Sequence, residues 1–198
     1  CLAAAGDGVE PGFRAVGGIA PHAGWVCSGA IAAEVIKILA ADPAIETFVV
    51  FGAAHRANMP HAAVFSAGRW HTPLGDVEID EPLARAAVAA SPLLVDDPAA
   101  HQWEHSIEVE LPFIRHLAPA ARLLPILVPP LEAAAEIGRA LAQQAQALDR
   151  RVVFLASTDL THYGPRYRFT PRGATREGIQ WAKEVNDRRL LDLILDFD

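Results

Sequence analysis

Short apolar runs alternate along the chain with segments in which apolar residues recur at helical spacing. The runs at residues 15–21, 47–52, 122–128 and 151–156 are nearly continuous in apolar residues and are bounded by turn-forming residues. Continuous apolar runs of this length are typical of strands buried on both faces of a sheet. The pattern therefore predicts four buried strands.

The segments between these strands favour helices. Ile31, Val35 and Leu39 lie on one helical face after a potential cap at Ser28, and Asp42-Pro43 ends that helix. Two shorter strands are expected around the Gly/Pro-bearing connection that follows the second buried strand. These shorter strands are residues 62–66 and 77–80. Further helices are expected at residues 81–90, 130–148 and 173–195. Another helix is expected to begin near Glu104, and Pro112 must kink or restart it.

Alternation of strands and helices predicts the fold class. Near-continuous apolar strands separated by helices indicate an α/β fold, a three-layer sandwich with a mostly parallel central sheet. The 198 residues suffice for one domain with a sizeable core, and we expect a single domain over residues 1–198. In such folds ligands bind beyond the carboxyl ends of the strands, so the residues at those ends deserve inspection.

Composition narrows the classes of partner. The net charge is −7, from 17 Lys and Arg against 24 Asp and Glu, which disfavours a nucleic acid or an anionic membrane surface as partner. No apolar run reaches the roughly 18 residues of a membrane span, and no signal-peptide pattern is present. Two cysteines, Cys1 and Cys27, fit a reducing compartment, so we expect a cytoplasmic protein. Since the chain starts at Cys1 and stops without a helix cap, we expect an incomplete chain.

Histidine and aspartate follow three of the predicted strands. His22 follows the first strand, His55 follows the second, and Asp159 and His162 form a D-x-x-H motif after the last. Because the carboxyl ends of parallel strands meet at one edge of a sheet, we expect these side chains to converge. For each residue alone the alternative is structural, since a single histidine in a loop is usually just hydrogen-bonded and Asp159 could cap a turn.

A converged set of this kind has the chemistry of a metal site. Two imidazoles and one carboxylate are typical ligands of non-haem Fe(II), and the same set can hold Zn²⁺ with an open position for water. A histidine beyond the ligand count could act as a general acid or base near neutral pH. The sequence therefore predicts a mononuclear metal centre, with the choice of metal open.

Other polar and aromatic residues flank the candidate ligands. Glu104 and His105 lie where a helix is expected to open, although Glu104 could be only a partner of the helix dipole. Trp25 and Trp103 could wall a pocket or belong to the core. Cys27 near a helix start would be a weak nucleophile candidate, since a buried free cysteine is commoner. The four histidines without a comparable setting are expected to be surface or structural residues: His61, His71, His101 and His116.

Four segments, in order, resemble the Memo family, also called Memo-like or AmmeMemoRadiSam system protein B. They are PHAGWVCSGAIAAEV (21–35), FGAAHRAN (51–58), EHSIEVELPFI (104–114) and STDLTHYGPRYRF (157–169). The family is similar in structure to class III extradiol ring-cleavage dioxygenases of the LigB-like fold. The resemblance therefore implies a LigB-like sandwich.

The resemblance also implies roles for particular residues. The family's PHAG histidine falls on His22 and its G-x-x-H histidine on His55, which would line the metal site. In Memo proteins a cysteine nearer the C-terminus completes the cluster, and neither that region nor the family's N-terminal R-x-P-A-x-A-G-x-F-Y-P segment is found in this chain. The third ligand would then be Asp159, or a segment outside this chain, or nothing, which would leave the site weak or empty.

Three hypotheses for function follow. The leading one is an Fe(II)-dependent dioxygenase-like or redox enzyme, with Zn or Cu as alternative metals; a Zn-dependent hydrolase and a non-catalytic binding protein for a peptide or small molecule are the others. The sequence predicts no oligomeric state. The expected roles are metal ligation by His22, His55 and Asp159, catalysis by His162, His105 and Asp159, and substrate or outer contacts by Glu104, Trp25 and Trp103.

Overall fold

The computed structural model describes residues 14–55 and 59–196. The chain divides into two compact units, Cys1–Thr158 and Asp159–Asp198, and each is described by itself. The prediction of one domain over the whole chain stays a prediction. Among the described residues, no helix is both long and apolar enough to cross a membrane, and a cytoplasmic location also stays a prediction.

The first unit is built on a six-stranded sheet in the order β1-β8-β2-β7-β3-β6. All neighbouring strands are parallel except β3 and β7, which are antiparallel. The mostly parallel sheet of the predicted α/β fold is confirmed. The strand bounds are β1 Gly17–Ala20, β2 Thr47–Ala53, β3 Ala62–Val64, β6 Leu94–Asp96, β7 Arg122–Val128 and β8 Val152–Ser157.

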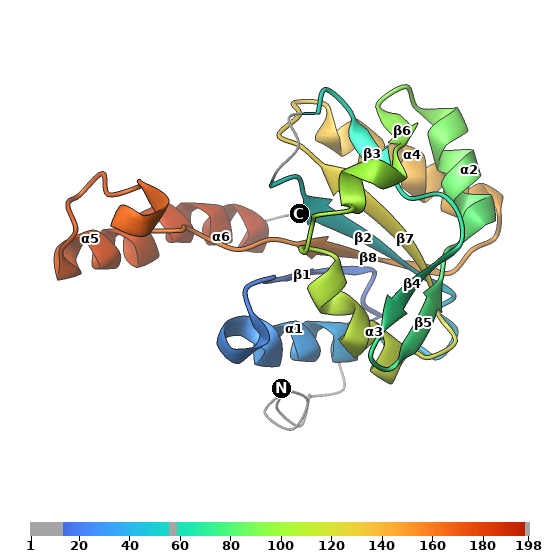
Figure 1. The fold of residues 1–198 in the computed structure, drawn as a ribbon, viewed down its shortest axis with the longest axis horizontal. Coiled ribbons are helices and arrows are strands. Elements are labelled where there is room, and N and C mark those ends of the chain that lie inside the picture. Colours follow the sequence, from blue (N-terminus) through green and yellow to red (C-terminus); the bar gives the residue numbers. More distant parts are fainter. Residues whose placement is uncertain (1–13, 56–58, 197–198) are drawn as a thin grey trace. The chain divides into compact units, whose positions relative to one another are not determined.

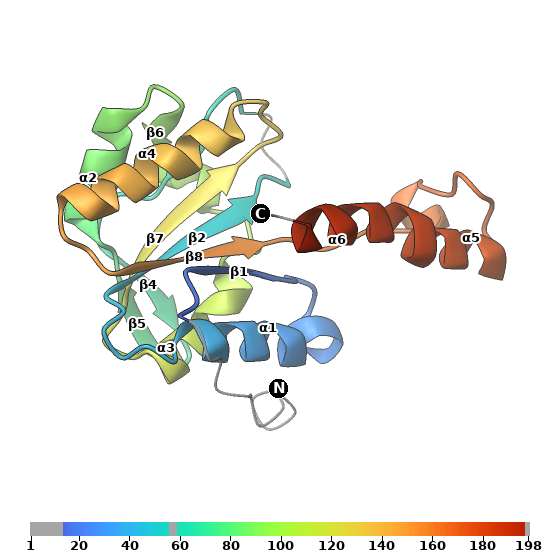
Figure 2. The same ribbon diagram turned by 180° about the vertical axis from the view of Figure 1, so that it is seen from behind.

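Helices cover both faces of this sheet, as the two opposite views in Figures 1 and 2 show. On one face, α1 (Trp25–Leu39) packs on β1 and contacts α3 (Leu111–Leu117). On the other, α2 (Glu81–Ala90) packs against α4 (Ala134–Ala147). The predicted three-layer arrangement is therefore confirmed.

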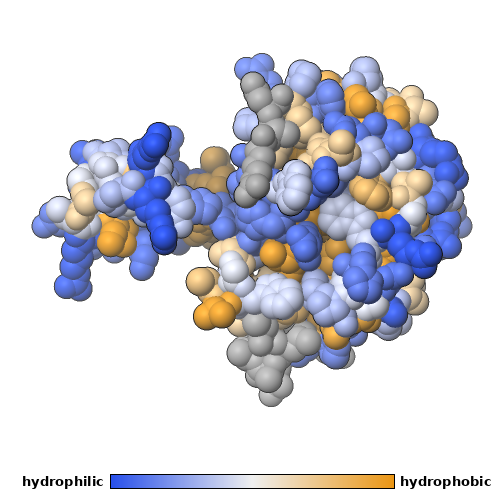
Figure 3. All heavy atoms as spheres, in the orientation of Figure 1, coloured by the Kyte–Doolittle hydropathy of each residue, from blue (hydrophilic) through white to orange (hydrophobic). Residues whose placement is uncertain are grey.

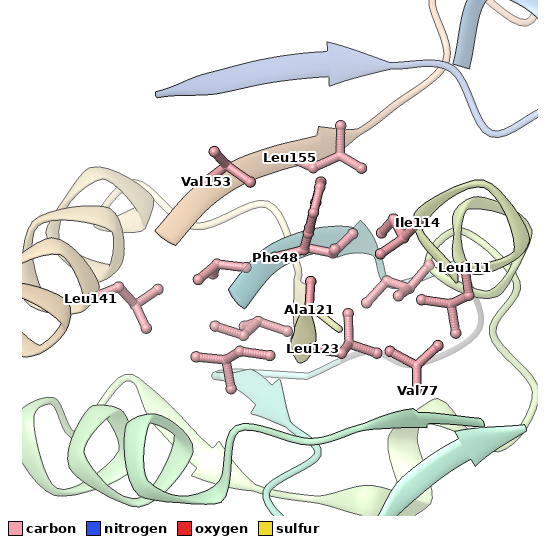
Figure 4. Close-up of a cluster of buried hydrophobic side chains, with 14 of the residues drawn as sticks. Phe48, Val77, Leu111, Ile114, Ala121, Leu123, Leu141, Val153 and Leu155 are labelled. Carbon is pink, nitrogen blue, oxygen red and sulfur yellow. The ribbon is translucent and has the colours of Figure 1, made fainter. Parts of the chain in front are cut away.

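The core lies between these layers. Phe48, Leu123 and Leu155 come from three neighbouring strands and are fully buried, and helix residues such as Ile114 and Leu141 close the cluster from either side (Figure 4). Burial of apolar side chains on both sides of β2, β7 and β8 explains why those strands read as continuous apolar runs. The same packing keeps the ends of these strands in place.

Two predicted helices differ from the observed ones. No helix begins at Glu104: a turn leads to a 3-10 helix, η2 (Glu108–Glu110), and α3 begins at Leu111, so that Pro112 lies in its first turn, where proline costs no hydrogen bond. The last predicted helix is instead three consecutive segments of the second unit. These are α5 (Arg176–Trp181), the π-helix η4 (Ala182–Asp187) and α6 (Arg188–Leu195).

A two-stranded antiparallel ribbon lies in the first unit outside the main sheet. It consists of β4 (Arg69–Thr72) and β5 (Gly75–Glu78), joined by a turn with Gly75 at φ 110°. A 3-10 helix, η1 (Pro98–His101), follows β6 and contacts β3. In the second unit, η3 (Pro165–Tyr167) precedes α5.

Candidate metal centre

The ends of β1 and β2 place His22 and His55 beside each other. Each histidine follows the last residue of its strand by two positions, and β8 pairs with both strands in parallel. The two imidazole rings lie 5.1 Å apart between centroids in an edge-to-face arrangement. The structure thus brings these two histidines together, and their role as ligands stays a prediction.

A third imidazole joins them from the loop between η1 and η2. The His105 ring lies 5.7 Å from that of His22 and 5.0 Å from that of His55, nearly parallel to the latter. Gly52 in β2 allows this loop to approach, because a Cβ at that position would lie 2.5 Å from Ile107 Cγ1 and 2.6 Å from Ser106 Oγ. Three imidazoles from distant parts of the chain therefore meet at one edge of the sheet.

Glu104 is the buried carboxylate beneath these rings. Its Oε2 accepts a hydrogen bond from the His55 backbone N–H at 2.9 Å. Its Oε1 accepts from the backbone N–H groups of His105 at 2.8 Å and Ser106 at 2.9 Å. The His55 ring adds a fourth contact, with Nδ1 2.9 Å from Oε1. Within the turn at residues 104–106, the backbone N–H groups therefore donate to the carboxylate of the first residue of that turn, Glu104.

These contacts determine the charge of Glu104. Burial acts to raise its pKa, but the hydrogen bonds from the His55 ring and from the backbone N–H groups of Ser106 and His55 outweigh burial and lower the pKa to about 2. Glu104 is therefore ionised at neutral pH. An ionised carboxylate accepts, so His55 Nδ1 carries the proton and Nε2 is left as the basic nitrogen, the arrangement that orients many metal-bound histidines.

Ser157 acts on His22 in a similar way. The Ser157 hydroxyl donates to the Ser106 carbonyl oxygen at 2.6 Å, and its oxygen lies 3.0 Å from Nδ1 of His22. Because the hydroxyl proton is directed to the carbonyl, the oxygen is free to accept from Nδ1–H. His22, which is only 3% exposed, then also has Nε2 as its basic nitrogen. Both imidazoles then present Nε2, one of the two nitrogens through which histidine binds metals.

Ligating atoms of His55, Glu104 and His105 all lie within 4.8 Å of one another. A spacing of this size is compatible with a single bound cation. The first unit therefore contains a group of residues that could hold a metal ion.

Comparison with known proteins agrees with the sequence motifs. A family model described as "Memo-like protein" matches residues 4–198. The chain belongs to the Memo family. It is 40% identical over 187 residues to a MEMO1 family protein of Thermococcus onnurineus, and 43% identical over 188 residues to one of Pyrococcus abyssi. Each alignment covers 91% of this chain and 64% of the relative, so the chain spans less than two thirds of the length of these relatives.

The Memo-family D-x-x-H motif lies at the start of the second unit. Within that unit, His162 Nε2 is 3.6 Å from Asp159 Oδ2, and the His162 ring lies 4.9 Å from that of Tyr167. Thr161, between them, is held by hydrogen bonds from its backbone N–H and its hydroxyl to Asp187 Oδ1. The roles of Asp159 as a third ligand and of His162 as an acid or base stay predictions.

Trp25 and Trp103, the two tryptophans next to the candidate ligands in sequence, are both exposed, so neither is a core residue. Trp25 donates from Nε1 to the Val109 carbonyl oxygen at 3.0 Å and ties the start of α1 to η2. Cys27 is a free, exposed cysteine in the first turn of α1, contrary to the buried position that is commoner for a free thiol.

Sequence reasoning missed two features of the centre. The first is Ser157, whose hydroxyl orients His22, and which is indistinguishable in sequence from any polar residue at a strand end. The second is a pocket of about 550 Å³ that reaches Glu104. It is lined by Phe65, Arg69, Trp70, His71, Pro98, Ala99, His101, Gln102, Glu104 and Glu108.

Proposed function

We propose that this Memo-family chain binds one divalent metal ion through Nε2 of His22 and of His55, with the His105 ring as the nearest further donor. The spacing of the three rings, 5.0 to 5.7 Å between centroids, is the observation that carries the proposal. Imidazole nitrogens that share an ion lie about 2.1 Å from it and hence roughly 3–3.5 Å from one another. In the described residues, the ligand atoms that lie within 4.8 Å of one another are those of His55, Glu104 and His105, so the proposal requires the neighbouring His22 ring to move toward this group when the ion binds.

Glu104 has a positioning role in this proposal. Four N–H donors already occupy its two oxygens, so it is better suited to orient His55 than to bind a cation directly. The carboxylate of a two-histidine, one-carboxylate Fe(II) site would then come from Asp159 or from outside this chain. Asp159 stays the candidate that the sequence predicts for this carboxylate, and Glu104 keeps its supporting role.

Our leading function is that of a dioxygenase-like or redox enzyme with a small-molecule or peptide ligand. An Fe(II) ion held by imidazoles supplies redox and oxygen chemistry when bound. His22 and His55 would be kept in one tautomer by Ser157 and Glu104. His162, whose Nε2 lies 3.6 Å from Asp159 Oδ2, is the residue that we propose as the general base for a substrate hydroxyl.

A second candidate function is a Zn²⁺-dependent hydrolase. The observation that favours it is the presence of three imidazoles together with a carboxylate that is already saturated by hydrogen bonds. Three histidines and a water form a common catalytic zinc site, in which the pKa of the water falls to about 7.

Metal content of protein purified without oxygen tests the proposal. We expect about one Fe, Zn or Cu per wild-type chain and none in the double variant His22→Ala/His55→Ala. The matched control His71→Ala/His116→Ala removes two exposed histidines and should keep the metal. Equal metal content in wild type and in the His22/His55 variant would contradict a metal site here.

Activity assays on the same preparations separate the functions. Iron binding with oxygen uptake supports the dioxygenase-like function, whereas zinc preference without oxygen uptake supports the hydrolase. Ligand binding that survives loss of both His22 and His55, without turnover, supports a purely binding protein.

A further inference from the structure

The helical stretch at the end of the second unit contains a π-helical segment that the sequence pattern did not predict. This segment, η4 (Ala182–Asp187), lies between the α-helical segments α5 and α6. In a π-helix each backbone hydrogen bond spans five residues instead of four, and such turns are rare and frequently found at functional sites. The last two residues of η4 are Asn186 and Asp187, and both contact the D-x-x-H motif.

Thr161, which lies between Asp159 and His162, is the residue that both of them contact. Its backbone N–H donates to Asp187 Oδ1 at 3.0 Å, and its hydroxyl donates to the same oxygen. The side-chain amide of Asn186 donates from Nδ2 to the Thr161 hydroxyl oxygen at 2.7 Å. The hydroxyl therefore both donates and accepts, so η4 holds the backbone and the side chain of Thr161 together.

Little buried apolar packing is available in this unit to hold the motif instead. Among the described residues of the second unit, the buried ones are Gly178 and Ala182. The face of this unit seen in Figure 3 is mostly hydrophilic. Hydrogen bonds to a carboxylate are among the stronger ones in proteins, so the contacts of Thr161 are well suited to fix the motif.

These hydrogen bonds act on the residue that directly precedes His162. The His162 ring lies 4.9 Å from that of Tyr167, and its Nε2 is 3.6 Å from Asp159 Oδ2. The side chain of His162 is 49% exposed, so its own contacts cover only half of it. Because the backbone conformation limits which rotamers a side chain can adopt, a fixed backbone at this point restricts where the imidazole can lie.

We propose that Asn186 and Asp187 are positioning residues, which act through Thr161 to keep His162 in contact with Asp159 and Tyr167. The π-helical segment places both side chains on the same threonine. That the positioned histidine serves as a general base rests on the proposed function; the positioning itself does not.

NMR of the full chain, kept metal-free with a chelator, tests the proposal. The measurement is the nuclear Overhauser contact between the ring protons of His162 and Tyr167, and His162→Gln assigns the histidine signals. We expect this contact to be lost in Thr161→Val, which replaces the hydroxyl by a methyl group, and to be kept in Thr161→Ser. The matched control Thr175→Val removes the hydroxyl that caps α5 by accepting from the Gly178 N–H, and it should keep the contact.

Amide hydrogen exchange at Thr161 gives a second measurement. Asp187→Ala removes the acceptor of this N–H, so we expect exchange about tenfold faster or more, the factor for one hydrogen bond to a charged group. Asp187→Asn keeps a side-chain oxygen that can accept and should restore most of the protection. The control Asp192→Ala removes an exposed partner of Arg188 in α6 and should leave the exchange of Thr161 unchanged.

Thermal unfolding of each variant separates positioning from stability. A purely structural role lowers the midpoint of unfolding and leaves the contact of His162 with Tyr167 intact below it, and this result would overturn the proposal. Absence of the contact from wild type, or equal behaviour of Thr161→Val and Thr175→Val, would also overturn it. If Thr161→Val does not fold, Asn186→Ala, which removes only the donor to the hydroxyl, gives the same comparison.

Because these measurements use metal-free protein, they do not depend on the metal content of wild type. Loss of the contact in Thr161→Val, in a chain that binds no metal, would refute the proposed function alone. A metal-binding chain whose Thr161→Val variant keeps the contact would refute the positioning alone.

Discussion

Two histidine–carboxylate pairs in the first unit have nearly the same geometry and very different surroundings. His55 Nδ1 lies 2.9 Å from Glu104 Oε1, and His71 Nδ1 lies 2.7 Å from Asp76 Oδ1. The side chain of Glu104 is 5% exposed, whereas those of His71 and Asp76 are 84% and 35% exposed. Distance alone therefore does not distinguish a candidate site from a surface contact.

The neighbours of each carboxylate make the difference. Glu104 accepts three backbone N–H bonds from its own turn and from the end of β2, and two further imidazoles approach that of His55. Asp76 faces His71 across the β4–β5 ribbon, where cross-strand pairs of opposite charge are common. Its pKa is lowered chiefly by the hydrogen bond from His71, although it remains in contact with water.

This comparison indicates what a site requires. A buried carboxylate stays ionised only where hydrogen bonds, here from backbone N–H groups, stabilise its charge. An exposed carboxylate is stabilised by water and needs no such support. Convergence of several imidazoles on one such anchor is what separates the His55–Glu104 pair from the His71–Asp76 pair.

The largest expected difference between the two pairs is the effect on metal affinity when each carboxylate is substituted. Glu104→Ala removes the partner that orients His55, so we expect the affinity for the preferred metal to fall about 10–100-fold. Asp76→Ala removes only the surface partner and should leave the affinity unchanged. Competition with a chromophoric chelator measures both. Similar losses in the two variants would remove the distinction.

The Glu104→Ala and Asp76→Ala proteins should also differ in their free energy of unfolding when no metal is present. Glu104→Ala leaves the backbone N–H groups of His55, His105 and Ser106 without their acceptor, and we expect the free energy of unfolding to fall by about 2–3 kcal/mol. Asp76→Ala should cause no measurable change, since its partners are exposed. Urea unfolding in chelator tests this, and an equally stable Glu104→Ala protein would count against the anchoring role.

The sequence predicted the central strands because they are buried on both faces. β2, β7 and β8 have continuous apolar runs, and the observed bounds nearly match. The β4–β5 ribbon was only partly predicted, since RWHT in β4 combines charged and aromatic residues and packs outside the main sheet. The three-residue strand β6 is too short to show a periodicity.

The part of the site that follows directly from the strand ends could be predicted from the sequence. His22 and His55 could be placed together because they follow parallel strands. The role of Glu104 as an anchor could not, because it depends on the backbone of the turn at residues 104–106. The ring contact between His101 and Trp70 could not be predicted either. The two residues come from η1 and β4, and no sequence motif links them.

Glu104 and Asp76 should also differ in how much each contributes to the loss of stability in acid. Glu104 has a folded-state pKa of about 2 against an ordinary value of 4.5, so its contribution to stability is present above pH 4.5 and is lost as the pH falls toward 2. Glu104→Gln should therefore flatten the fall in stability across this window in metal-free protein, and Asp76→Asn should flatten it far less. Urea midpoints measured from pH 5 to pH 2.5 give the comparison; equal slopes in Glu104→Gln and wild type would contradict it.

A last comparison sets a buried histidine, His101, against an exposed one, His116. Burial lowers the pKa of His101 to about 4 from an ordinary 6.5, so the unfolded chain takes up a proton below pH 6.5 that the folded chain resists until about pH 4. Stability should therefore fall as the pH drops from 6.5 to 4, a window above that of Glu104. His101→Phe should reduce this fall, while His116→Phe, at an exposed position, should keep it. If both variants follow the wild-type curve between pH 6.5 and pH 4, burial does not keep His101 neutral in the folded protein.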